Sequence, residues 1–79
     1  MTDYQPISCV DHERLEYAVL TRRKLDITWR APHEAERHGR LMPLDVQTKD
    51  GAEWLTAGDS QGTPHVIRLD WISVFGEAE

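Results

Sequence analysis

The chain has 79 residues, of which 39% are hydrophobic and 29% charged, a composition typical of one soluble globular domain rather than a disordered or membrane-embedded chain. Its 14 acidic residues against 9 lysines and arginines give a formal net charge of -5, which disfavours non-specific binding to nucleic acid and favours a basic partner. A core this small leaves little room for a buried polar active site, so we do not expect an enzyme.

Cysteine content and the N-terminal sequence indicate the compartment. The single cysteine, Cys9, cannot form an internal disulfide, and no basic segment followed by an apolar run opens the chain. We therefore expect a cytoplasmic protein with no membrane segment, monomeric when free. No repeat, linker composition or long block of like charge interrupts residues 1–79, which predicts a single domain.

One amphipathic helix is predicted, over residues 11–20. Leu15, Ala18 and Val19 recur at the i, i+3 and i+4 spacing of a single helical face. Asp11 can cap the first turn, because its carboxylate can accept from the free amides there. Ser8 as the cap, with Asp11 three residues later, is the alternative.

The opposite face of this helix carries Glu13, Glu16, Tyr17 and Leu20. At about 100° per residue, these side chains project away from the apolar face. Two readings are open: the face is the ordinary solvated side of an amphipathic helix, or it is an acidic and aromatic surface that meets a partner.

A β-sheet is predicted over residues 24–76. Leu25, Ile27 and Trp29 alternate with polar residues, which indicates a half-buried strand. Residues 31–38 contain a proline and many charges, and we expect a loop there.

The second predicted strand places Met42, Leu44 and Val46 on its apolar face. Pro43 lies inside this strand and lacks a backbone donor. It therefore indicates either an edge position or a bulge.

Turn signals divide the rest of the chain. Asp50 and Gly51 predict a hairpin, and a further turn is expected over residues 58–62. Apolar alternation runs to Leu69 and then slips by one residue before Ile72, which indicates a bulge or a tight corner. One helix followed by five short, bent strands predicts a mostly β domain of the small Sm-like or SH3-like barrel kind.

Candidate metal and catalytic residues are few. Cys9, His12, His33 and His38 are residue types that bind zinc, but their spacing matches no common zinc pattern, so we expect no metal and no cofactor. Cys9 with His12 lacks the third group that orients a catalytic base, so no catalytic residue is predicted. We expect Cys9 to be a buried packing residue.

A basic segment at residues 21–24, "TRRK", provides the alternative function. Together with Arg30, Arg37 and Arg40 it could form a stripe that binds RNA, as Sm-like barrels often do. Acidic residues such as Asp26 lie close to these bases, which favours a solvated surface of mixed charge.

Both ends of the chain resemble one family. "YQPISCVDHERLEYA" is similar to the opening of the Rho-binding antiterminator family (Rof), whose members begin with Tyr-x-Pro-Ile-x-Cys and continue into an acidic helix with Leu-Glu and a following alanine. The matching residues are Tyr4, Pro6, Ile7, Cys9, Asp11, Leu15, Glu16 and Ala18. "RLDWISVF", residues 68–75, resembles the closing Arg-Leu-Asp-x-Ile strand of that family.

The resemblance implies an Sm-like fold and a protein that binds the bacterial transcription termination factor Rho, a hexameric RNA-dependent ATPase, and inhibits Rho-dependent termination. On this hypothesis an acidic helix takes the place of RNA at the basic primary sites of Rho, and no direct nucleic acid binding is expected. The candidate Rho-binding residues are Tyr4, Asp11, Glu13, Glu16 and Tyr17. The acids supply charge, and the tyrosines supply aromatic anchors.

Overall fold

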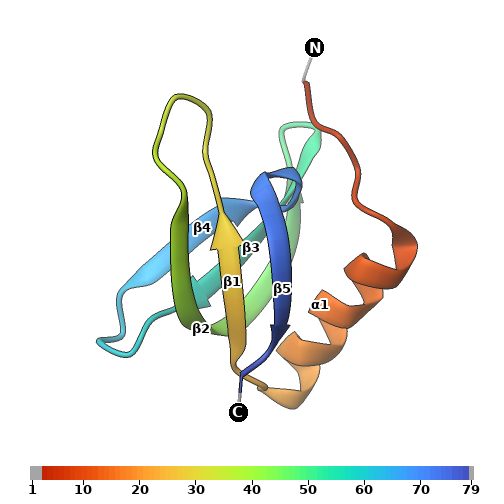
Figure 1. The fold of residues 1–79 in the computed structure, drawn as a ribbon. Coiled ribbons are helices and arrows are strands. Elements are labelled where there is room, and N and C mark those ends of the chain that lie inside the picture. Colours follow the sequence, from red (N-terminus) through yellow and green to blue (C-terminus); the bar gives the residue numbers. More distant parts are fainter. Residues whose placement is uncertain (1–2, 79) are drawn as a thin grey trace.

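A computed structural model describes residues 3–78, which contain one helix and five strands. The elements are α1 (Cys9–Thr21), β1 (Leu25–Trp29), β2 (Arg37–Lys49), β3 (Ala52–Gly58), β4 (Pro64–Arg68), a 3₁₀ turn (Leu69–Trp71) and β5 (Ile72–Glu77). The strands form one antiparallel sheet in the order β4-β3-β2-β1-β5, so β4 and β5 are its edges, and α1 runs beside β5 (Figure 1). The mostly β class with an N-terminal helix is confirmed. Within the described residues, no helix has the length and apolar character needed to cross a membrane.

The start of α1 is set by Ser8. Its side-chain oxygen accepts a hydrogen bond from the backbone N–H of Asp11 at 3.1 Å, and its extended backbone conformation is that of a helix cap. The prediction that Asp11 caps the helix is therefore wrong, and the alternative with Ser8 is confirmed. Helix α1 consequently begins at Cys9, two residues before the predicted start.

The core lies between α1 and the concave side of the sheet. Leu15 is fully buried and Ala18 is 3% exposed, so the predicted inward face of the helix is confirmed. The other buried members of the core cluster come from the strands and the 3₁₀ turn: Leu25, Ile27, Trp29, Leu41, Leu55, Ala57, Ile67 and Leu69. All three apolar residues of β1 are among them, which confirms its predicted alternation.

Strand β2 is long and serves two partners. Its first half pairs with β1 and its second half with β3, and the register shifts between Pro43 and Asp45. The predicted bulge is confirmed, whereas an edge position is wrong because β2 is the central strand. The predicted apolar face is wrong at Leu44, which is 49% exposed while Leu41 and Pro43 are buried, but Val46 is partly buried and packs against the core as predicted. The predicted alternation placed Pro43 on the outward face of this strand, but Pro43 is buried.

The two tight connections follow the sequence signals. Asp50 and Gly51 both have positive φ, 53° and 75°, as a two-residue hairpin requires, and they join the paired residues Lys49 and Ala52. The slip before Ile72 is explained by the 3₁₀ turn that separates β4 from β5. A corner at this point lets the chain cross from one edge of the sheet to the other.

The turn between β3 and β4 is organised by Asp59. Its Oδ1 accepts from the backbone N–H groups of Gln61 (2.9 Å) and Thr63 (3.0 Å), and its Oδ2 lies 3.0 Å from Nε2 of His65. The hydrogen bond with His65, followed by that with the Thr63 backbone, holds the pKa of Asp59 below its ordinary value of 3.8.

Replacing Asp59 with asparagine is expected to flatten the acid limb of the stability profile. Because the folded-state pKa of Asp59 is depressed, its contribution is present above pH 3.8 and is lost as the pH falls through the folded-state value. Urea midpoints measured across this acid range should fall more steeply for the wild type than for Asp59→Asn. Glu36→Gln, which changes an exposed loop acid, is the control, and parallel curves for wild type and Asp59→Asn would contradict the prediction.

Candidate partner-binding surface

The outward face of α1 is exposed as predicted. Tyr17 is 56% exposed and Leu20 is 82% exposed, and the carboxylates of Glu13 and Glu16 also face solvent. Among residues 3–78, no cation lies within ion-pair distance of Glu13. The helix therefore presents unneutralised negative charge beside an exposed aromatic ring.

A groove separates this face from β5. It has a volume of about 680 Å³, and its walls include Val10, Glu13, Tyr17, Phe75 and Glu77. The two acids come from different elements, and Arg14 also lines the groove, with its guanidinium 4.4 Å over the ring of Phe75. An apolar channel with carboxylates on both walls suits a long aliphatic side chain that ends in a positive charge.

Asp11 contributes less free charge than Glu13. Its Oδ1 accepts from Nη1 of Arg14 at 3.2 Å. The same guanidinium lies 4.4 Å over the ring of Phe75 and donates to the Phe75 carbonyl at 3.3 Å. Asp11 thus helps to hold Arg14 against β5, and its charge is shared within the protein.

Glu16 belongs to a network that reaches the sheet. His12 contacts both Glu53, with Nε2 to Oε2 at 2.8 Å, and Glu16, with Nδ1 to Oε2 at 3.6 Å. Tyr4 forms a side-chain hydrogen bond with Glu53, and burial, followed by the negative charges of Glu53 and Asp70, raises the pKa of its phenol above 10.0. This network joins the N-terminal segment, the helix and β3.

Tyr4 therefore sits differently from the other candidate residues. It is partly buried, it packs against the core cluster, and the guanidinium of Arg68 lies 5.8 Å from the centre of its ring. Through Glu53 and His12 it is connected to Glu16, but it does not share the exposed face that carries Tyr17. The five predicted residues form two groups, one toward β5 (Asp11, Glu13 and Tyr17) and one toward β3 (Tyr4 and Glu16).

Two acidic residues of the sheet were missed by sequence reasoning. Glu53 contacts His12, and Asp45 lines a shallow groove of about 270 Å³ together with Glu16 and Leu20. Neither acid carries a sequence signal, because only the packing of α1 against the sheet brings it near the helix. They extend the acidic surface from α1 onto β2 and β3.

The basic segment at residues 21–24 is partly neutralised. Arg23 lies 3.6 Å from Glu77, and Arg40 lies 3.3 Å from Asp26 across the β1–β2 pair. Arg22 adopts the left-handed conformation that ends α1, with φ of 54°. The stripe is therefore a surface of mixed charge, as the sequence indicates.

The residues considered for metal binding are dispersed. Within the described part of the chain, no group of three or more His, Cys, Asp or Glu side chains could hold a metal ion. Cys9 is exposed, so the prediction that it is a buried packing residue is wrong. Cys9 is the first residue of α1, after the cap Ser8, and its side chain points outward.

No protein-family model matches the chain, and no curated protein matches it significantly. The function of the surface is therefore argued from its geometry.

Proposed function

We propose that this protein binds the transcription termination factor Rho and inhibits Rho-dependent termination, by an acidic surface that competes with RNA at the primary RNA-binding sites of Rho. One observation carries the proposal: the outward face of α1 exposes Glu13 and Glu16 beside Tyr17, and Glu13 has no ion-pair partner among the described residues. The resemblance of residues 4–18 and 68–75 to the Rho-binding antiterminator family adds the identity of the partner.

The architecture is consistent with this proposal. A helix before five antiparallel strands, with a 3₁₀ corner before the last strand, is the arrangement expected of an Sm-like domain. We extend the proposal to the fold and assign the chain to the Sm-like kind. In this arrangement α1 packs against the sheet through Leu15 and Ala18, and its opposite face is exposed, where a large partner can reach it (Figure 1).

Electrostatic complementarity explains the competition with RNA. Sites that hold phosphates must be basic, and carboxylates accept charge-assisted hydrogen bonds from the same arginine and lysine donors. Glu13 and Glu16 are neighbours at the i, i+3 spacing, with Cβ atoms about 5–6 Å apart. Each bound carboxylate occupies a donor that RNA needs, so RNA loading is blocked without any chemical step.

Specific contact comes from the aromatic residues. The groove between α1 and β5 can take the aliphatic stem of a lysine or arginine of Rho along Tyr17 and Phe75, with its charge at Glu13 or Glu77. Tyr4 acts indirectly, since it holds Glu53 beside His12. Glu53 and Asp45 add negative charge at the margin of the contact.

Reversing the charge of the helix face tests the proposal. The double variant Glu13→Lys/Glu16→Lys is expected to weaken binding to purified Rho by more than about tenfold, because like charges then face each other. Binding is measured by pull-down and by fluorescence anisotropy. Release of labelled RNA from Rho should fall in parallel, and Rho-dependent termination in vitro should recover because inhibition is lost.

A matched control changes the same charge elsewhere. Glu34→Lys/Glu36→Lys alters two exposed acids of the β1–β2 loop and should bind Rho with nearly wild-type affinity. Equal weakening by both double variants would indicate a general charge effect and would contradict the assignment of the surface. A wild-type protein that ignores Rho but shifts RNA in a gel would overturn the function in favour of the RNA-binding alternative. In that case the salt dependence of the RNA complex should change on mutating residues 22–24.

A further inference from the structure

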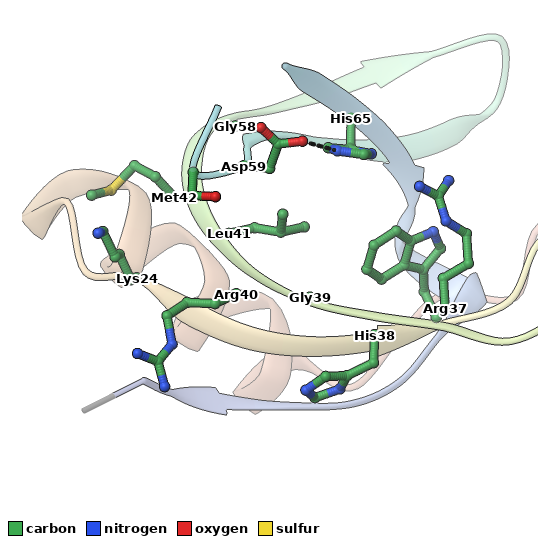
Figure 2. A pocket seen from close by; sticks show the side chains of 12 residues that line it. Lys24, Arg37, His38, Gly39, Arg40, Leu41, Met42, Gly58, Asp59 and His65 are labelled. Carbon is green, nitrogen blue, oxygen red and sulfur yellow. Dashed lines mark hydrogen bonds and ion pairs between the residues drawn. The ribbon is translucent and has the colours of Figure 1, made fainter. Parts of the chain in front are cut away.

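A hollow lies on the concave side of the sheet, and no residue of α1 lines it. Strands β1 and β2 form one wall, the end of β3 and the start of β4 form the other, and the volume is about 670 Å³ (Figure 2). Trp29 and Leu41 provide an apolar floor, and Arg37, Asp59 and His65 add polar groups. The hollow is therefore separate from the surface proposed to meet Rho, and the following inference does not depend on that function.

Two glycines line the hollow, one from each wall. Gly39 lies in β2, and Gly58 ends β3. Neither has positive φ, and a Cβ on Gly39 would come no closer than 3.6 Å to Leu41, while one on Gly58 would come no closer than 3.9 Å to Leu44. Backbone conformation and local packing therefore do not require glycine. A Cβ on Gly58 would face the exposed Leu44, which does not line the hollow, whereas one on Gly39 would face Leu41 and Trp29 in its floor. A glycine inside a strand can mark the close approach of a ligand, and space for one explains Gly39.

Positive charge is concentrated at this hollow in a chain whose net charge is -5. Figure 2 shows Arg37 and His65 on facing walls and Lys24 at the other end, whereas Arg40 and His38 point to the opposite side of β2. The guanidinium of Arg37 lies 5.1 Å from the ring centre of Trp29. In residues 3–78, no carboxylate lies within ion-pair distance of Arg37 or Lys24.

Among residues 3–78, one carboxylate lines the hollow, and it is already engaged. Asp59 accepts hydrogen bonds from two backbone N–H groups and contacts Nε2 of His65. It therefore fixes the imidazole of His65 in the wall. Arg37 and Lys24 then make the hollow suitable for an anion that carries more than one negative charge.

We propose that this hollow binds a small phosphorylated molecule of nucleotide size. The fork of Arg37 holds its phosphate groups, and the floor formed by Trp29 and Leu41 carries its organic part. The volume falls within the range of about 300–1,000 Å³ usual for small-molecule sites. The mixture of an apolar floor and a few convergent polar groups is also typical of such sites.

The protein of residues 1–79 can be tested by titration with ADP and with inorganic pyrophosphate, observed through backbone amide resonances. We expect ADP to shift the resonances of residues that line the hollow, and pyrophosphate alone to bind more weakly. Arg37→Gln and Gly39→Val should each weaken ADP binding by at least about tenfold, the first by removing a charge-assisted contact and the second by filling the space. Lys49→Gln removes one positive charge outside the hollow and should leave affinity within about twofold.

Several results would overturn the proposal. These are the absence of shifts with both ligands, shifts confined to residues outside the hollow, or equal losses for Arg37→Gln and Lys49→Gln. Equal binding of pyrophosphate and ADP would remove the role of the apolar floor. Binding of a single-stranded RNA oligomer without binding of ADP would replace the small-molecule site by an RNA surface. If Gly39→Val does not fold, judged by its amide spectrum, Arg37→Gln with Lys49→Gln decides the question.

Discussion

Replacing Leu15 with alanine is expected to lower the free energy of unfolding by about 2–5 kcal/mol, the range found for large-to-small changes in a core. Leu15 is fully buried, and it is the largest side chain that α1 places in the core. The remaining contact of the helix depends on Ala18 and on the partly buried Val19, which have little area to compensate. Since domains of this size have about 3–5 kcal/mol to spare, the variant should be largely unfolded or have a detached helix.

Urea unfolding followed by far-UV circular dichroism measures this effect. The control is Leu20→Ala, which removes the same atoms from a side chain that is 82% exposed and should change stability by no more than about 0.5 kcal/mol. Similar losses for the two variants would mean that α1 is not anchored through Leu15. The proposed Rho-binding residues lie on the opposite face of this helix, so Leu15→Ala should also weaken Rho binding. The double variant Glu13→Lys/Glu16→Lys changes exposed residues and should not alter stability strongly.

The second large effect is expected at Arg68. Its guanidinium donates to both carboxylate oxygens of Asp70, at 2.6 and 2.9 Å, and to Asp3 at 3.0 Å. Asp70 in turn accepts from the backbone N–H of Gln5 at 3.0 Å. The side chains of Arg68 and Asp70 are only 13% and 9% exposed, so a two-pronged ion pair is held at the corner between β4 and β5.

Asp70→Ala is expected to lower the urea midpoint substantially, because it leaves the guanidinium of Arg68 partly buried without its main partner. The double variant Arg68→Met/Asp70→Leu should recover much of the loss, since removal of both charges leaves no unpaired charge at the partly buried corner. Asp26→Ala breaks the more exposed pair with Arg40 and should cost only about 0–1 kcal/mol. A double variant less stable than Asp70→Ala would contradict this account.

Local signals predicted the elements whose structure is decided locally. The spacing of Leu15 and Ala18 identified the buried face of α1, and the alternation in β1 identified its buried residues. Asp50 and Gly51 predicted the hairpin because both positions require positive φ. In each case a few neighbouring residues carry the information.

Features that depend on distant contacts were not predictable in the same way. The buried face of β2 depends on the bulge at Pro43, and the placement of Tyr4 depends on residues of β3 and the 3₁₀ turn. Glu53 joins the candidate surface only because α1 packs against the sheet. The hollow beside Gly39 likewise depends on the sheet, which brings residues of β1 and β2 opposite residues of β3 and β4.

The pairing of β1 with β5 has a consequence for synthesis on the ribosome. Leu25 pairs with Glu77 and Trp29 pairs with Ile72, so an early strand receives its second neighbour only when the last strand has emerged. The hydrogen bond from the backbone N–H of Gln5 to Asp70 also joins an early residue to a late one, 65 positions apart. A nascent chain can form α1 and the β2–β3 hairpin early, but one edge of β1 stays open until the C-terminal segment is released. We therefore expect the cooperative folding step to wait until β5 has left the ribosome, and to be slow for a chain of this length.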